Sequence, residues 1–337
     1  MNDNEKIIRA RIREASSDGA ISFRDYIEYA LYTPGAGYYT RPEARVGRTQ
    51  SRDFYTAESL GSVFSRLVVA AARQLLGPDT CARSTFVEIG AEPGYSLLDA
   101  IEEPPFAAHK ILRHGDALTI PPQSVVFANE WLDALPFHRL IFRAGTWRER
   151  GVRANPEGRL EEALLDEWSP RVAAVRKRLP EEAPEGYQLD LPLDAERALA
   201  DLVSQDWNGL LLLFDYGRTH DALTSACPSG TARTYQRHKQ GQDLLEAPGD
   251  MDITCDVCWD PLQAELSRAG FKSVALESQE AFFAHHAEEA AAAIVRDTAG
   301  AFSRERQTLM ELMHPAHMGQ RFQVLRGVRT FCAARKM

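Results

Sequence analysis

The chain has 337 residues, and 44% of them are hydrophobic, which suffices for one large domain with insertions or for two modest domains. The formal net charge is -9 and the isoelectric point is about 5.6. With this acidic balance we expect no broad basic surface of the kind that attracts the phosphate backbone of nucleic acids, although it leaves room for a local basic groove.

Several features are typical of a cytoplasmic protein. The N-terminal stretch MNDNEKIIRARIREA lacks the apolar core of a signal peptide. The best apolar run, residues 209–214, falls far short of the roughly 20 residues that a membrane-spanning helix needs. The five cysteines are odd in number and irregularly spaced, as in a reducing compartment. We expect a cytoplasmic location and neither membrane nor nucleic acid as partner; the sequence does not indicate the oligomeric state.

Residues 1–80 carry apolar side chains at helical spacing. The pattern predicts helices within residues 5–32, where Ser22 is a candidate N-cap, and over residues 59–76. We therefore expect a mostly helical N-terminal region.

Residues 85–94, TFVEIGAEPG, join a short apolar run to a glycine turn. In nucleotide-cofactor loops a buried strand ends at such a turn, and the glycines let the backbone approach the ligand. Gly90 and Gly94 stand at the outer positions of a G-x-G-x-G pattern, but Glu92 occupies the middle one. The alternative is a strand followed by an ordinary tight turn.

From Thr85 onwards, short apolar runs alternate with helical pieces. Continuous apolar strands in this arrangement predict an α/β fold with a mostly parallel sheet covered on both faces. The expected strands include residues 85–89, 111–112, 124–128, 138–142, 209–217 and 322–328. Residues 147–160 resemble a hairpin that turns at 155–158, and helices are expected at 158–205 and 280–313. The predicted core is 81–150 and 206–337, with a hairpin and helical insertion at 151–205.

Four blocks of the sequence are distinctive: ISFRDYIEYALYTPGAGYY (21–39), DFYTA (53–57), FANEWLDALP (127–136), and LLFDYG (212–217) followed by APGDMDIT (247–254). Together they resemble the MidA-like family of class I S-adenosylmethionine-dependent methyltransferases, whose members include a mitochondrial complex I assembly factor that methylates an arginine. The resemblance implies a Rossmann-like core, S-adenosylmethionine as cofactor, and a protein side-chain nitrogen, arginine by analogy, as the methyl acceptor.

The resemblance also assigns roles around the first strand. Glu88, Gly90 and Gly94 would line the methionine end of the cofactor, and Asn129 belongs to the same edge of the sheet. For Glu88 the alternative is a strand-end carboxylate that caps the next helix, expected at residues 96–102.

The candidate catalytic residues are Glu130 and Asp133, which follow the strand SVVFA. A guanidinium has a pKa above about 12, so a site that methylates it needs carboxylates to orient it and take its proton. Because Glu130 and Asp133 are three positions apart, a helical turn would place both acids on one side. The alternative is that the acids stand here only because the positive end of the helix dipole favours acidic residues at a helix start. Trp131 could stack on a cation or simply belong to the core.

Two further groups are candidates for substrate binding or a lid. Asp53, Phe54 and Thr56 match a family block from the N-terminal region, which the resemblance implies closes over the core. Asp215 and Tyr216 end another strand at the same edge. Either group could instead serve loop architecture.

The chain departs from the family pattern at the cofactor region. A carboxylate at Glu92 would face the carboxylate of the cofactor's methionine moiety. The segment between Gly94 and Asn129 is too short for the usual further strand and helix, so one strand and one cofactor anchor look missing. Asp116 would contact either the adenine or the ribose. These departures support an alternative function, a homologue that has lost the cofactor and acts as an interaction or assembly module.

We predict no metal site. Cys255 and Cys258 form a C-x-x-C, but no second pair follows at ligand spacing. The pair His285-His286 and the histidines at 314 and 317 lack a third ligand in the sequence and are expected on the surface.

Overall fold

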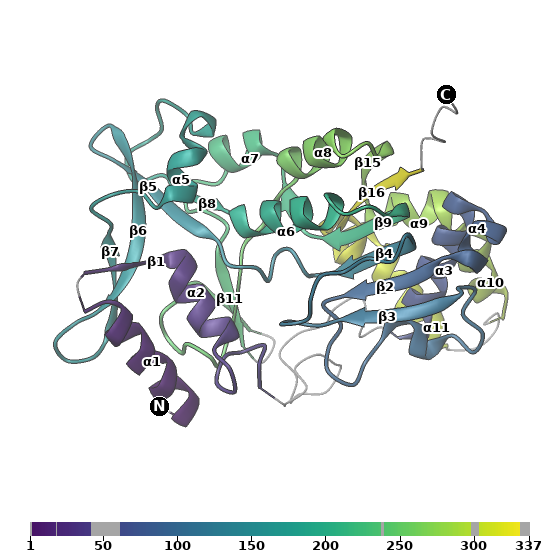
Figure 1. Cartoon of the computed structure of the whole chain (residues 1–337), viewed down its shortest axis with the longest axis horizontal. Coiled ribbons are helices and arrows are strands. Elements are labelled where there is room, and N and C mark those ends of the chain that lie inside the picture. The colour runs from purple at the N-terminus through teal and green to yellow at the C-terminus, as the bar shows by residue number, and fades with distance from the viewer. Residues whose placement is uncertain (1, 18, 42–60, 237–238, 298–302, 331–337) are drawn as a thin grey trace.

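A six-stranded sheet forms the centre of one of two lobes in the computed structural model of the chain (Figure 1). The structure describes residues 2–17, 19–41, 61–236, 239–297 and 303–330. The strands of this sheet lie in the order β15 (Lys272–Ser278), β16 (Gln323–Arg329), β9 (Asn208–Asp215), β4 (Gln123–Asn129), β2 (Thr85–Ile89) and β3 (Ala108–Leu112).

The strand directions match a Rossmann-like core. β3, β2, β4 and β9 run parallel, whereas β16 is antiparallel to both β9 and β15. The predicted mostly parallel sheet is therefore confirmed. Residues 113–122, which connect β3 to β4, contain neither helix nor strand, as the short segment before Asn129 predicts. The carboxyl ends of the parallel strands meet at one edge of the sheet.

Helices cover both faces of this sheet. On one face lie α3 (Ser62–Leu76), α9 (Gln279–His286), α10 (Glu288–Asp297) and α11 (Arg304–Met313), and on the other lie α6 (Leu193–Val203) and α8 (Trp259–Arg268). Successive side chains of a strand point to opposite faces. Accordingly, Leu212 and Phe214 pack in the first core, and Leu211 and Leu213 pack in the second. Every residue of β9 is buried, which explains its uninterrupted apolar sequence.

The second lobe is built on a five-stranded antiparallel sheet. Its strands are β1 (Ile21–Ser22), β6 (Thr146–Ala154), β5 (His138–Arg143), β8 (Gln188–Leu191) and, paired with β6, β7 (Leu160–Leu164). The expectation that residues 138–142 belong to the parallel sheet is wrong, because β5 pairs antiparallel with β6 and β8. The range 81–150 predicted for the core thus contains β5 and part of β6. An apolar run signals a strand, but not its partner.

Local signals in the second lobe behave as the sequence predicts. β6 and β7 form the hairpin, and its turn places Gly158 at φ 77°. The helices expected within residues 5–32 are α1 (Asp3–Ala15) and α2 (Phe23–Tyr32). The hydroxyl of Ser22 accepts a hydrogen bond from the amide of Asp25 and so caps α2. Both helices bury their apolar faces against this lobe.

The remaining elements are short. They are α4 (Pro78–Arg83), η2 (Leu97–Ala100), α5 (Pro170–Ala174), η3 (Arg176–Arg178), α7 (His220–Ser225), η4 (Pro315–Gly319), the sheet of β12 (Lys239–Gly241), β11 (Arg233–Gln236) and β13 (Asp252–Thr254), and the pair β10 (Gly217–Arg218) and β14 (Val257–Cys258). The helix expected at residues 96–102 is wrong in extent, because only the four-residue η2 forms before Pro104 and Pro105.

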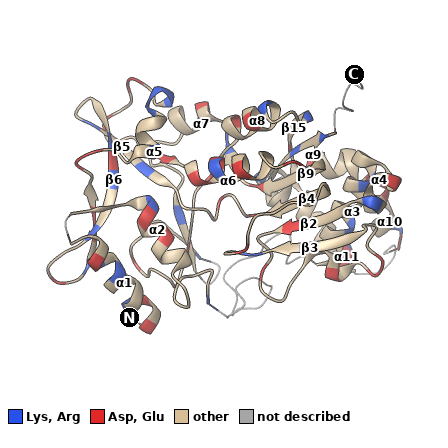
Figure 2. Cartoon of the chain, in the orientation of Figure 1, with Lys and Arg blue, Asp and Glu red and all other residues tan. Residues whose placement is uncertain are grey.

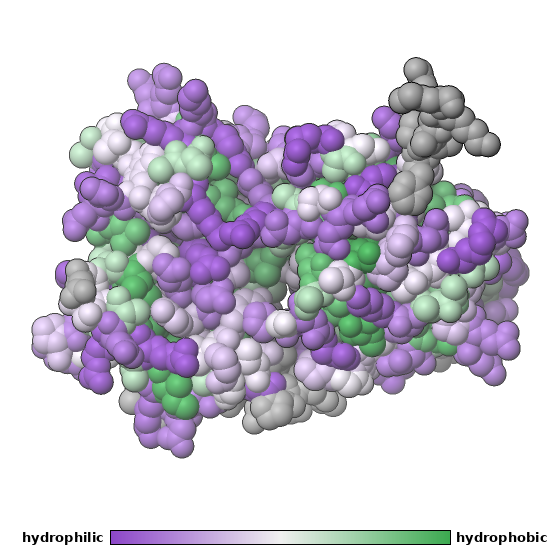
Figure 3. Space-filling model, viewed as in Figure 1, coloured by the Kyte–Doolittle hydropathy of each residue, from purple (hydrophilic) through white to green (hydrophobic). Residues whose placement is uncertain are grey.

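The surface mixes charges and apolar groups. Acidic and basic residues are interspersed over both lobes (Figure 2), and on the face shown in Figure 3 hydrophobic areas lie between hydrophilic ones. No helix in the described ranges combines the length and apolar character needed to cross a bilayer.

The close approach of β4 and β9 depends on Gly209. A Cβ atom there would overlap the carbonyl oxygen of Ser124, and the φ of 126° disfavours other residues, whereas the space around Gly270, at φ 86°, is open. We expect Gly209→Ala to lower the free energy of unfolding by about 3 kcal/mol or more. The matched Gly270→Ala should cost about 1 kcal/mol, since only its backbone is strained. Urea unfolding of both variants checks this; equal losses would contradict it.

Candidate functional site

A cavity of about 1410 Å³ lies at the carboxyl ends of the parallel strands. The loops after β2, β3 and β4 form one part of its wall, and the segment around α11 and η4 forms another. The second lobe adds residues from α2, from the segment that follows it and from β13, which belongs to this lobe because its Ile253 packs in the same core as α1 and α2. The residues that line the cavity include Tyr32, Tyr39, Gly90, Glu92, Asp116, Asn129, Glu130, Trp131, Asp133, Tyr216 and Asp252.

The loop after β2 presents its backbone to the cavity. Gly90 has φ 81°, and a Cβ atom added to it would stand 3.5 Å from the side chain of Trp131. Its amide donates to the carbonyl oxygen of Leu112 at 2.9 Å, which ties the loop to the end of β3. Gly94 has φ 75° but does not line the cavity, whereas Glu92 does. The loop therefore combines an open backbone with an acidic side chain.

Glu88 lies behind this loop instead of lining the cavity. Its side chain is buried, and its Oε1 accepts from the amide of Leu97 at 2.9 Å. Its Oε2 accepts from the Ser96 hydroxyl at 2.8 Å and lies 3.2 Å from Nε2 of His109. This geometry fits the alternative interpretation of Glu88, a carboxylate that caps the following turn of helix.

The loop after β4 carries the acidic block. The Asn129 side-chain amide donates to Oε1 of Glu130 at 3.2 Å. Glu130 adopts φ 49°, a left-handed conformation that costs about 1 kcal/mol or more for a residue with a Cβ atom. Its amide donates to the carbonyl oxygen of Phe214 at 2.9 Å, which holds it against the end of β9.

The carboxylate of Asp215, at the end of β9, holds the same loop through hydrogen bonds. Its Oδ2 accepts from the amides of Leu132 at 3.0 Å and Asp133 at 3.2 Å, and its Oδ1 accepts from the amide of Tyr216 at 2.9 Å. Burial raises its pKa well above the usual range, and the nearby Asp133 adds to the shift. Asp215 does not line the cavity, so its contacts fit the architectural alternative, while Tyr216 does line it.

Asp133 offers an open acceptor to the cavity. Its side chain is 5% exposed, and its Oδ2 accepts from the Thr254 hydroxyl at 2.8 Å. Within the described part of the chain, Oδ1 of Asp133 and Oδ1 of Asn129 are buried without a hydrogen-bond donor. Burial raises the pKa of Asp133. Such atoms cost free energy unless a ligand supplies donors.

Sequence reasoning missed two residues of this wall. The hydroxyl of Tyr39 donates to Oδ1 of Asp252 at 2.8 Å. Burial, with a smaller contribution from Asp133, raises the pKa of Asp252 to about 7. Both residues belong to the distinctive blocks 21–39 and 247–254, but no local pattern marks them, because their burial follows from packing between distant segments.

Asp116 follows β3, the strand next to β2. It is exposed, and its Oδ2 accepts from the amide of Arg113 at 2.8 Å. It shares the cavity wall with Gly90. The candidates Asp53, Phe54 and Thr56 lie outside the described residues.

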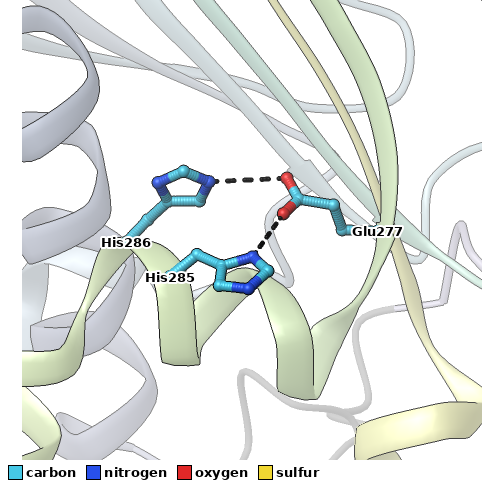
Figure 4. Close-up of side chains that lie close together, drawn as sticks. All are labelled: Glu277, His285 and His286. Carbon is cyan, nitrogen blue, oxygen red and sulfur yellow. Dashed lines mark hydrogen bonds and ion pairs between the residues drawn. The ribbon is translucent and has the colours of Figure 1, made fainter.

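The histidine pair does acquire a third side chain, contrary to expectation. Figure 4 shows Glu277 facing His285 and His286, with Oε1 of the glutamate 2.9 Å from Nδ1 of His285 and Oε2 3.4 Å from Nε2 of His286. However, Nε of Arg326 also lies 2.6 Å from Oε2. Because this guanidinium already neutralises the carboxylate and would repel a metal ion, the cluster does not favour a metal site.

Asp215 should make a large contribution to the stability of the fold. We expect Asp215→Ala to lower the free energy of unfolding by about 3 kcal/mol or more, because it leaves buried amides without an acceptor. Asp116→Ala removes an exposed carboxylate with one local contact and should cost less than about 1 kcal/mol. Chemical unfolding of the two variants compares the losses. A similar small effect for both would mean that Asp215 does not hold the loop.

Comparisons with known proteins agree with this geometry. A family model described as "Putative S-adenosyl-L-methionine-dependent methyltransferase" matches residues 83–276, more than half of the chain. The chain is 26% identical over 312 residues to the mitochondrial protein arginine methyltransferase NDUFAF7 homolog of Drosophila melanogaster, covering 75% of this chain and 67% of that protein. It is 25% identical to mitochondrial NDUFAF7 of Mus musculus, covering 95% and 84%. The cytoplasmic location stays a prediction.

Solved structures share the fold. A COG1565 superfamily member from Burkholderia thailandensis, bound to S-adenosyl-homocysteine, superposes with a TM-score of 0.83 at 24% identity, covering 97% of this chain and 92% of that one. The native crystal structure of a COG1565 superfamily protein from the same organism gives 0.79. The fold, the cavity and the family match lead to one conclusion: the chain belongs to the MidA-like family of S-adenosylmethionine-dependent methyltransferases.

Proposed function

We propose that this chain transfers a methyl group from S-adenosylmethionine to a protein side-chain nitrogen, with arginine as the acceptor. The observation that carries the proposal is the pair of acids, Glu130 and Asp133, on the cavity wall beside the Gly90 loop. The relatives in Drosophila melanogaster and Mus musculus are named protein arginine methyltransferases, which supports the same acceptor.

The residues at the strand ends fit the cofactor. Gly90 exposes its backbone to the cavity, so a ligand can approach where a side chain would otherwise stand. The open Oδ1 of Asn129 suits a cationic amino group. We infer that Asp116 accepts hydrogen bonds from the ribose, because acids that follow the strand next to the glycine turn take this role in dinucleotide folds. When bound, S-adenosylmethionine would supply a methyl carbon on a sulfonium: a nitrogen nucleophile attacks this carbon, the carbon–sulfur bond breaks, and S-adenosylhomocysteine leaves with the electron pair.

The acids of the β4 loop would prepare the acceptor. A protonated guanidinium is a poor nucleophile, so the site must hold its N–H groups and remove a proton. Oδ1 of Asp133 has no donor among the described residues and can take such an N–H group. Its raised pKa favours the step in which the carboxylate receives the proton. Positioning and charge stabilisation are the chief contributions a protein makes to such a displacement.

Cofactor binding can be tested by calorimetric titration with S-adenosylhomocysteine. We expect the wild-type chain to bind. Gly90→Ala should weaken binding at least about tenfold, because its φ of 81° disfavours alanine and Gly90 itself lines the cavity. Gly94→Ala is the matched variant, with equal backbone strain but outside the cavity, and should have a smaller effect.

The same titration tests whether Glu92 obstructs the loop. Glu92→Gly should tighten binding about fivefold, the effect of removing a repulsion of about 1 kcal/mol between two carboxylates. Unchanged affinity would show that Glu92 is no obstruction. If the wild-type chain gives no heat at millimolar ligand, the methyltransferase proposal is wrong and the interaction module gains support.

Glu130 can be tested without disturbing the backbone. Asparagine tolerates left-handed φ values, so Glu130→Asn should keep the stability of the fold. Methyl transfer from labelled S-adenosylmethionine to an arginine-containing peptide library should fall about 100-fold or more. Affinity for S-adenosylhomocysteine should stay nearly unchanged. A lysine-only library is the control for the acceptor; labelling of lysine alone would contradict the arginine assignment, and full activity of Glu130→Asn would contradict the role of Glu130.

A further inference from the structure

Two buried carboxylates from different lobes share one part of the cavity wall. Asp133 follows β4, and Asp252 opens β13; each is 5% exposed, and both line the cavity. The Thr254 hydroxyl lies 2.8 Å from Oδ2 and 3.1 Å from the main-chain oxygen of Asp133. Alternate residues of a strand face the same side about 6.6 Å apart. Asp252 therefore stands one strand repeat away from the hydroxyl that touches Asp133.

Neither carboxylate has a dedicated cation. In the described ranges, no Lys or Arg nitrogen lies within 4.0 Å of Asp133 or Asp252. Arg233 influences the pKa of both acids, but its Nη1 is 2.7 Å from Oδ1 of Asp256 and its guanidinium lies over the ring of Tyr216 at 4.5 Å. Two buried acids without a counterion are costly, and a cationic ligand would offset that cost.

We propose that Asp133 and Asp252 together form the receptor for the cationic side chain of the substrate, each carboxylate binding one edge of a guanidinium. This proposal rests on the proposed function and adds Asp252, and with it a residue from the second lobe, to the substrate site. A planar guanidinium with five N–H donors matches two separated acceptors better than the compact ammonium of lysine. Tyr39 is a positioning residue, because its hydroxyl donates to Oδ1 of Asp252.

The charge state of Asp252 makes the receptor sensitive to pH. Burial and Asp133 raise the pKa of Asp252 to about 7, whereas Tyr39 and Arg233 act in the opposite direction. The hydroxyl of Tyr216, whose own pKa is raised well above 10, stays neutral near Asp252. The cation binds the ionised carboxylate, so affinity falls as pH drops below about 7 and levels off above it.

The test is a calorimetric titration of the full chain with methylguanidinium, without cofactor, and with methylammonium as the comparison ligand. Methylguanidinium should bind more tightly than methylammonium, and its affinity should fall about tenfold per pH unit below pH 7. Asp252→Asn should weaken binding at least about tenfold at pH 8 and flatten the pH profile. Asp250→Asn is the matched control. Asp250 pairs with Arg41 and does not line the cavity, so its replacement should change neither property.

Tyr39→Phe tests the positioning role of Tyr39 through the pH profile of methylguanidinium binding, which the loss of a purely structural residue would leave unchanged. It removes the hydrogen bond that lowers the pKa of Asp252, so the midpoint of the pH profile should shift upwards. A profile that is unchanged in both Tyr39→Phe and Asp252→Asn would overturn the proposal, as would equal binding of methylammonium.

Thermal unfolding shows whether Asp252→Asn loses binding because it does not fold or because it lacks the carboxylate. A carboxyl whose folded pKa is raised contributes stability below its unfolded pKa, near 4, and loses it as pH rises through about 7. Asp252→Asn should therefore melt higher than the wild type at pH 8 and nearly equally at pH 4. If the wild type binds methylguanidinium as expected but transfers no methyl group, the proposed function fails and the receptor stands. If Asp252→Asn methylates arginine with a wild-type KM, the receptor is wrong.

Discussion

The hydrogen bonds that Asp215 accepts from the amides of Leu132 and Asp133 are the contacts on which the site depends. They join the end of β9 to the loop after β4, and they set the direction in which that loop leaves the sheet. The amide of Glu130 adds a second tie, to the carbonyl oxygen of Phe214. Because both ties use backbone groups, the loop keeps its shape while its side chains face the cavity. Asp215 thus shapes the cavity wall without itself lining the cavity.

The cavity wall is less stable than the core beneath it. Glu130 holds a left-handed backbone, and Asp133 and Asp252 are buried with raised pKa values. Each of these features opposes folding, whereas the aromatic core around Phe64 and Phe214 favours it. Strain and buried charge concentrated at one edge of a well-packed sheet are typical of a binding site that a ligand completes.

Sequence patterns predicted the parts of the structure that depend on local chemistry. The strand at 85–89, the glycine turn at Gly90, the N-cap Ser22 and the hairpin turn at 155–158 all follow from neighbouring residues. What the patterns missed depends on partners far along the chain. An apolar run cannot show that residues 138–142 pair antiparallel with β6 instead of joining the parallel sheet.

Asp252 is a residue that sequence patterns missed because its partner is distant in the chain. It also shows which part of the cavity wall each lobe supplies. It lies 213 positions after Tyr39, and only packing of the N-terminal segment against β13 brings the two together. The loops after β2 and β3 belong to the sheet lobe and carry the groups that suit a nucleotide cofactor. Asp252 and Tyr39 come from the other lobe and face the acids of the β4 loop. Residues of both lobes line the cavity, so under the proposed function the acceptor nitrogen can be held only when both lobes are in place.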